Sequence, residues 1–186
     1  SFYENEEKRS TLYIWMLGCG PPDESVVLYG RRTSEVKECI DTLANICDTG
    51  YNKIIIYVHY LGADFQFIRR WFEWDKVFCD DTRGVYYAIY RGIEFRCELK
   101  LAGGRSLAEC GKNLRIYTSY QKKVGDLNYS LKRHSGTPLT IQELGYCEFD
   151  VLTSLAYITE KIIEDGSIAN IPLTNTGYVR NHIRNA

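Results

Sequence analysis

A chain of 186 residues, 45% hydrophobic and 25% charged, is long enough to bury a core and has the composition of one soluble globular domain. Its net charge of −1 excludes a general attraction for nucleic acid, so DNA binding would have to come from local basic pairs such as Arg31–Arg32. No stretch approaches the roughly 18 apolar residues of a membrane span, and the acidic N-terminus differs from a signal peptide, so we expect a cytoplasmic protein without a membrane partner.

The chain opens with a predicted β-hairpin. Residues 11–17 (TLYIWML) and 25–29 (SVVLY) have the composition of strands, and the turn residues 18–23 (GCGPPD) separate them. The apolar period then changes to that of a helix, which begins at Thr33–Ser34 and which Gly50 closes.

A buried strand is predicted next. Residues 54–58 (IIIYV) form a continuous apolar run, typical of a strand covered on both faces of an α/β sheet. Apolar residues at helical spacing over 65–72 follow it.

The second half alternates between short strands and helix. Residues 77–80, 85–91 and 92–98 look like strands, and the Arg91–Gly92 turn joins the last two as a hairpin. After an irregular stretch, the capping box Thr140–Glu143 starts a long helix that stops at Gly166. We therefore predict an α/β fold with a mixed central sheet flanked by helices.

Seven cysteines occur without a C-x-x-C pair and without a Cys/His pair at zinc spacing. An odd number of scattered cysteines predicts reduced, mostly buried thiols.

Asp64 stands where the buried strand gives way to a helix. An Asp at this position can simply accept hydrogen bonds from the amides of the first helical turn. Functional groups of α/β sheets, however, also collect at the carboxyl ends of strands, and aromatic neighbours there could stack on a ligand. His59 is more commonly a partner in a local hydrogen bond than a metal ligand. The residues alone leave these alternatives open.

Tyr146 and Asp150 lie four positions apart on the predicted long helix, so their side chains project from one face. Most such pairs are surface or core-edge residues. Together with Asp64 they also suit phosphodiester hydrolysis, in which clustered carboxylates hold two metal ions and another group orients the attacking water.

Four segments carry a family resemblance. Residues 59–67 (HYLGADFQF) resemble the second exonuclease motif of the protein-primed family B DNA polymerases of bacteriophages and mobile elements, commonly H-N-L-x-x-D followed by aromatic residues. Residues 146–150 (YCEFD) match the Y-x-x-x-D of the third motif. Residues 124–129 (VGDLNY) are similar to a G-D-[IL]-[DN]-Y stretch between these motifs, and 171–181 (IPLTNTGYVRN) resemble the segment leading to the polymerase palm. The matches keep the family order over nearly the whole chain.

The resemblance implies a ribonuclease-H-like fold of the DnaQ-like exonuclease type and 3′–5′ proofreading with Mg²⁺ or Mn²⁺. Asp150 would bind a metal ion directly, Asp64 would support the second ion or its water shell, and Tyr146 would orient the nucleophilic water. The implied partners are a single-stranded DNA 3′ end, the polymerase palm and a terminal priming protein, in the cytoplasm of a bacterial host. The implied DNA-binding residues are Tyr57, His59, Tyr60, Phe67, Ser106 and Leu107.

The chain departs from the family at several positions. The first motif, D-x-E-[TS], which supplies two of the four carboxylates, is missing; Glu4, Glu6 and Glu7 have the wrong spacing and suit a solvated acidic loop. Tyr60 replaces an Asn that contacts DNA. Val124 stands near a position where some members have a catalytic Lys, a role that Lys122 or Lys123 would have to cover.

These departures predict an exonuclease-like domain over 1–168 that lacks its first motif and has little catalysis, followed by an arm over 169–186. The alternative is a catalytically inactive remnant that binds single-stranded DNA or a protein.

Overall fold

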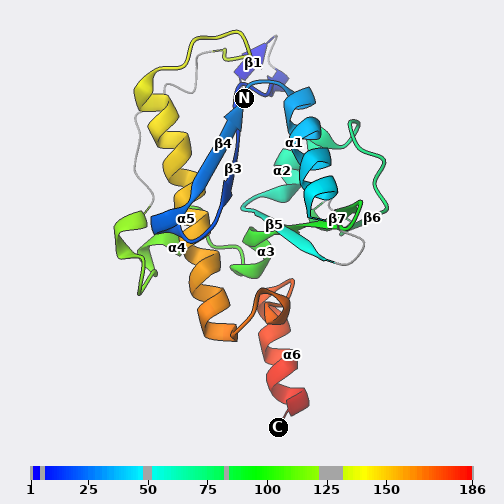
Figure 1. Ribbon diagram of the computed structural model, residues 1–186, viewed down its shortest axis with the longest axis vertical. Coiled ribbons are helices and arrows are strands. Elements are labelled where there is room, and N and C mark those ends of the chain that lie inside the picture. Colours follow the sequence, from blue (N-terminus) through cyan, green and yellow to red (C-terminus); the bar gives the residue numbers. More distant parts are fainter. Residues whose placement is uncertain (1, 5–6, 48–51, 82–83, 122–131, 186) are drawn as a thin grey trace.

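The centre of the protein is a four-stranded mixed sheet in the order β5-β8-β7-β6. The computed structural model describes residues 2–4, 7–47, 52–81, 84–121 and 132–185 (Figure 1). Strand β5 runs parallel to β8, and the other neighbours are antiparallel, which confirms the predicted mixed α/β sheet. The strands of this sheet are β5 (Ile54–Val58), β6 (Lys76–Cys79), β7 (Val85–Tyr90) and β8 (Ile93–Cys97).

Two antiparallel hairpins form separate sheets. One joins β3 (Trp15–Cys19) to β4 (Val26–Gly30), which confirms the predicted hairpin, although its first strand starts later than expected. The other joins β1 (Phe2–Glu4) to β2 (Glu7–Arg9), so the expectation of an acidic loop is wrong for Glu4 and Glu7. Glu6 lies outside the described residues.

The three predicted helices occur in the predicted order, and three more, α3, α4 and α6, lie in segments that were not predicted to be helical. The longest, α5, begins behind the Thr140–Glu143 capping box and ends at Gly166, whose φ of 75° suits a glycine that stops a helix. Helix α2 starts at Leu61, earlier than the apolar pattern of 65–72 indicates. Gly50 lies outside the described residues. The helices are α1 (Thr33–Ile46), α2 (Leu61–Ile68), α3 (Glu98–Leu101), α4 (Leu107–Lys112), α5 (Ile141–Asp165) and α6 (Asn175–Asn185), with 3-10 turns at Pro22–Glu24, Thr118–Tyr120 and Ile168–Asn170. Across the described ranges, none of them combines the length and apolar character needed to cross a membrane.

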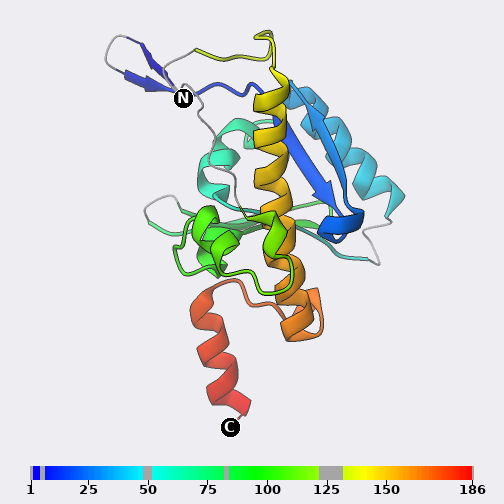
Figure 2. The ribbon, with the colours of Figure 1, turned by 90° about the vertical axis from the view of Figure 1, so that its left-hand side faces the viewer.

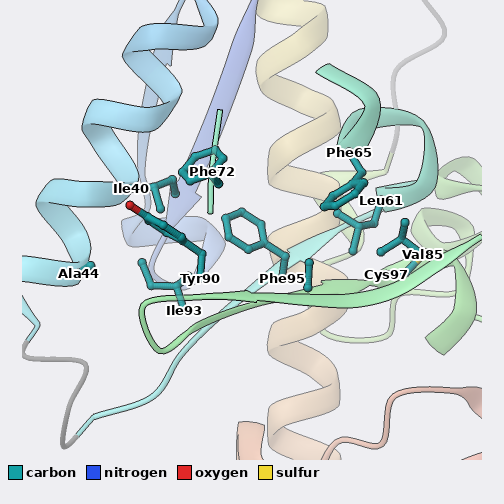
Figure 3. Packing of buried hydrophobic residues seen from close by; sticks show 11 residues of the cluster. Ile40, Ala44, Leu61, Phe65, Phe72, Val85, Tyr90, Ile93, Phe95 and Cys97 are labelled. Carbon is teal, nitrogen blue, oxygen red and sulfur yellow. The ribbon is translucent and has the colours of Figure 1, made fainter. Parts of the chain in front are cut away.

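Helices cover both faces of the sheet. A first hydrophobic cluster joins α1 and α2 to one face, where Phe95 of β8 packs among apolar residues of the helices (Figure 3). A second joins α3, α4 and α5 to Ile171, with Tyr57 of β5 packed against it. Side chains of β5 alternate between the two clusters, as a strand between two layers requires. Helix α5 also contacts β3, so it borders both the hairpin and the sheet (Figures 1 and 2).

Both faces of β5 are covered, as predicted, because Ile54, Ile56 and Val58 pack against the first cluster and Tyr57 packs against the second. Strand β5 lies at an edge of the sheet, and each of its residues is only half-buried. The internal, fully buried strand is β8. The sequence of β8 does not resemble that of a buried strand because it contains two charged residues, Glu94 and Arg96. These residues form an ion pair, with 2.7 Å between Glu94 Oε1 and Arg96 Nε, which lets both be buried.

All seven cysteines lie in the described part of the chain and are free thiols, as predicted. The expectation that most are buried is wrong, because only Cys97 and Cys110 are buried.

Candidate functional site

A groove with a volume of about 750 Å³ separates β3 from β5 and runs along α5. Both Asp64 and Asp150 line it, although they belong to different helices and lie far apart in the sequence. Of the residues predicted to bind metal or DNA, the groove brings together Tyr57, His59, Tyr60, Asp64, Leu107 and Asp150. Tyr146, Phe67 and Ser106 are not among its lining residues.

Asp64 lies in the first turn of α2 but does not cap the helix. The backbone carbonyl of Tyr60 accepts from the amides of Ala63 and Asp64, at 3.0 and 3.3 Å, and the helix has no side-chain cap. The interpretation of Asp64 as a capping residue is therefore wrong. The accessible surface area of Asp64 is that of an exposed residue. Nearby protein atoms nevertheless desolvate its carboxyl group and raise its pKa, an effect that His59 partly opposes. Because water still reaches the residue, we expect this rise to be modest.

Asp150 lies in the middle of α5 and is half-buried. Tyr146, one helical turn before it, is also half-buried, and the two share one side of the helix as predicted. Only Asp150 of this pair lines the groove.

His59 contacts the carboxyl group of Glu98, a residue that the sequence motifs did not indicate. Its Nδ1 lies 3.0 Å from Oε1 of Glu98, and Ser154 Oγ donates to Oε2 of the same group. Glu98 is fully buried, so this carboxyl group fixes the orientation of the His59 ring from inside the protein. This confirms His59 as a partner in a local hydrogen bond.

The position of Glu98 follows from strand register. Val58 pairs with Cys97 in the parallel β5–β8 ladder, so the next residue of each strand, His59 and Glu98, meet at the same end. The amide of Leu99 also donates to the carbonyl of His59, at 2.9 Å. To predict the contact between His59 and Glu98, one would have to know that residues 54–58 pair in parallel with residues 93–97. No local sequence pattern indicates this strand pairing.

The aromatic residues predicted to bind DNA differ in exposure. Tyr60 is 58% exposed and lines the groove. Tyr57 also takes part in the packing of the fold, because its hydroxyl accepts a hydrogen bond from Arg96 Nη1 at 3.3 Å. Burial raises the pKa of Tyr57, an effect that Arg96 opposes. Phe67 is half-buried on α2, three residues after Asp64.

Ser106 and Leu107 begin α4. Ser106 Oγ accepts from the amide of Glu109 at 3.3 Å, and the Glu109 carboxylate accepts from the Ser106 amide at 2.7 Å. This capping box accounts for Ser106 structurally. Leu107 is buried and contributes an apolar side chain to the groove.

The acidic groups present fit a divalent cation only in part. In the described ranges no group of three or more His, Cys, Asp or Glu side chains could hold a metal ion, and Asp64 and Asp150 are the carboxylates that line the groove. Two carboxylates supply fewer oxygens and less negative charge than two divalent ions need. Residues 124–129, with Lys122, Lys123 and Val124, lie outside the described residues.

Comparisons with models of protein families, with curated proteins and with solved structures find no match to this chain.

Proposed function

We propose that the groove binds the 3′ end of single-stranded DNA and that the chain represents a 3′–5′ proofreading exonuclease domain of a protein-primed family B DNA polymerase. The observation that carries this proposal is that Asp64 and Asp150 line one groove beside the exposed ring of Tyr60. Carboxylates are the ligands that Mg²⁺ and Mn²⁺ prefer, and an exposed aromatic ring can stack on a base.

The residues have distinct roles in this proposal. In a parent protein that supplied the two missing carboxylates, Asp150 would bind a divalent ion and Asp64 would support a second ion or its water shell. Tyr146, one helical turn before Asp150 although outside the groove lining, would orient the attacking water. The ion, when bound, lowers the pKa of that water and neutralises charge on the phosphate. Tyr60 stacks on the terminal base, while Glu98 holds His59 toward the groove.

With only two carboxylates in the described groove, we propose that the chain by itself binds DNA but hydrolyses it little or not at all. A domain that binds single-stranded DNA or a protein without hydrolysis is therefore the second candidate. Hydrolysis, the polymerase palm and a priming protein belong to the proposal for a longer parent protein.

The test is a titration of 5′-labelled oligothymidylate, followed by fluorescence anisotropy at two salt concentrations with Mg²⁺ or Mn²⁺. We expect affinity that falls as salt rises, because phosphate contacts release counterions. Tyr60→Ala should weaken binding roughly tenfold through the loss of stacking. Tyr29→Ala is the matched control, since Tyr29 is 56% exposed but belongs to β4 outside the groove.

Gel analysis of the same mixtures separates the two candidates. Shortened oligonucleotides in the presence of Mn²⁺ would overturn the proposal that this chain does not hydrolyse DNA. Absence of any salt-sensitive binding would overturn the DNA-binding function itself.

A further inference from the structure

The two carboxylates of the groove come from helices that pack on opposite faces of the sheet. Asp64 belongs to α2, whose buried residues Leu61 and Phe65 lie in the first hydrophobic cluster, whereas Asp150 belongs to α5, whose buried apolar residues lie in the second. Hydrophobic packing therefore fixes each helix to its own face of the sheet. Groups that act on one ligand must be held within about 0.5 Å of their working geometry, so a further contact has to join the two helices.

Glu98 contacts both of these elements. One carboxyl oxygen, Oε1, lies 3.0 Å from Nδ1 of His59, which stands just before the start of α2. The other oxygen, Oε2, accepts a hydrogen bond from Oγ of Ser154, which lies one helical turn after Asp150 on the same side of α5. A single carboxyl group thus spans the two elements that carry Asp64 and Asp150.

Glu98 is itself held firmly in place. It is the first residue of α3, it directly follows the internal strand β8, and its exposed fraction is 0%. The backbone beside it is also fixed, because the amide of Leu99 donates to the carbonyl of His59 at 2.9 Å. Glu98 is not among the residues that line the groove, so it can act on a ligand there only through its neighbours.

The two neighbours of Glu98 both reach the groove. His59 and Ser154 line it together with Asp64 and Asp150. Desolvation raises the pKa of Asp64, and His59 is near enough to oppose this rise. The contacts of Glu98 therefore extend to each groove carboxylate through one intermediate residue.

We propose that Glu98 is a positioning residue that sets the distance between Asp64 and Asp150. Its two oxygens hold His59 and Ser154 at the spacing of one carboxyl group. The inference rests on the proposed function, in which the two groove carboxylates act on the same phosphodiester. Glu98→Gln keeps two polar atoms at the same spacing and should preserve the positioning, whereas Glu98→Met keeps the length of the side chain but lacks both atoms.

Hydrogen exchange followed by NMR tests this coupling without metal or DNA. Ser154→Ala removes the contact from α5, and its effect should reach α2 through Glu98, so we expect the amides of Ala63 and Asp64 to exchange about fivefold faster. In the Glu98→Met protein the same substitution should have no further effect on these amides. Thr159→Ala is the matched control, since Thr159 is another half-buried hydroxyl residue of α5 that lines the groove.

Three results of this experiment would overturn the proposal. They are faster exchange confined to α5, equal effects of Ser154→Ala and Thr159→Ala on α2, and an effect of Ser154→Ala that persists in the Glu98→Met protein. Amides of α1 show whether a variant has changed the stability of the whole protein. If Glu98→Met does not fold, His59→Phe breaks the other end of the link and takes its place in the comparison.

Mn²⁺ binding, measured by electron paramagnetic resonance, connects this coupling to the proposed site. Glu98→Met should weaken the binding about tenfold, because the two carboxylates lose their fixed spacing, whereas Glu98→Gln should stay within about twofold of wild type. Unchanged affinity of Glu98→Met would overturn the positioning role and leave the metal site in place. Absence of Mn²⁺ binding by the wild type would instead overturn the metal site, and hydrogen exchange would still decide whether Glu98 links the two helices.

Discussion

The carboxylate of Glu98 is fully buried and accepts hydrogen bonds from His59 and Ser154. Glu98→Ala would leave both donors without an acceptor and would open a cavity. We expect a loss of about 2–4 kcal/mol in the free energy of unfolding, measured by urea denaturation followed by tryptophan fluorescence. Glu98→Gln, which keeps one acceptor oxygen and nearly the same volume, should cost less.

The control for this prediction is Glu38→Ala on the exposed side of α1, which should change stability by less than about 0.5 kcal/mol. If Glu98→Ala were as mild as Glu38→Ala, the buried network would not contribute to the fold.

Asp64 is predicted to reduce stability at neutral pH. Desolvation raises its folded-state pKa above the unfolded value of 3.8, so the neutral form favours folding at low pH, and this contribution is lost as pH rises through the folded pKa. Asp64→Asn removes the ionised form, and we therefore expect a higher Tm than wild type at pH 7 and no difference near pH 3. Calorimetry at both pH values measures this.

Asp81→Asn, at an exposed position outside the groove, should leave Tm unchanged at either pH. A lower Tm for Asp64→Asn at pH 7 would show that the carboxylate has a stabilising partner and would contradict the assigned pKa direction.

The two groove carboxylates should differ in their effect on a metal ion. If Asp150 binds the ion directly and Asp64 acts partly through water, Asp150→Asn should weaken Mn²⁺ binding more than Asp64→Asn does. The loss of a direct carboxylate ligand removes both an oxygen and a charge. Electron paramagnetic resonance of free Mn²⁺ measures both affinities. Equal effects, or none, would remove the metal-site assignment.

At the scale of elements, Glu160 connects α5 to the segment after α4. Its carboxylate accepts from the backbone amides of Arg115, Ile116 and Tyr117 at 2.7–3.0 Å. Burial by itself raises the pKa of Glu160, but these three donors outweigh it and lower the net pKa. The ionised form thus stabilises the fold above the unfolded pKa of 4.5, and this contribution is lost as pH falls through the folded pKa.

Glu160→Gln should therefore destabilise the protein by about 1–3 kcal/mol at pH 7, and the difference from wild type should shrink below about pH 4.5. Chemical denaturation at several pH values checks both parts. Glu164→Gln, on the same helix with its side chain 44% exposed and paired with Lys161, is the control and should cost less than about 0.5 kcal/mol, because exposed ion pairs contribute little. A pH-independent loss would mean that packing, not charge, holds Glu160.

Elements with local signals could be predicted from the sequence. The Arg91–Gly92 turn, where both φ angles are positive at 48° and 77°, and the capping box of α5 depend on neighbouring residues. The order of the strands could not be predicted, because pairing depends on contacts between distant segments. The apolar run of β5 indicated a strand covered on both faces but not its place in the sheet. The structure puts β5 at an edge and β8, with its buried ion pair, inside the sheet.

At the scale of the whole molecule, the sequence indicated part of the candidate site. Asp64 follows β5, and Asp150 lies on the long helix beside it, so a common groove follows once α5 packs along the sheet. Glu98 could not be found, because its approach to His59 depends on the register of a parallel strand pair.

The C-terminal segment bears on where the boundary of the domain lies. The predicted domain boundary falls at 168/169, yet Ile171 is 2% exposed in the second hydrophobic cluster, and its carbonyl accepts from Arg96 Nη1 at 3.1 Å. Helix α6 extends away from the rest of the chain (Figures 1 and 2), with Val179 and Ile183 largely exposed.

Two truncations separate these contributions. Removal of 175–186 deletes mainly the packing of Tyr178 and its 2.6 Å hydrogen bond to Asp165, and should cost about 1–2 kcal/mol. Removal of 169–186 also deletes Ile171 and leaves the buried Arg96 with one acceptor fewer, so it should cost about 3–5 kcal/mol. Urea denaturation of both proteins measures the difference. Equal stabilities would place the boundary at 168/169, whereas the expected difference would place it after Ile171, because a residue that fills the core belongs to the domain that it stabilises.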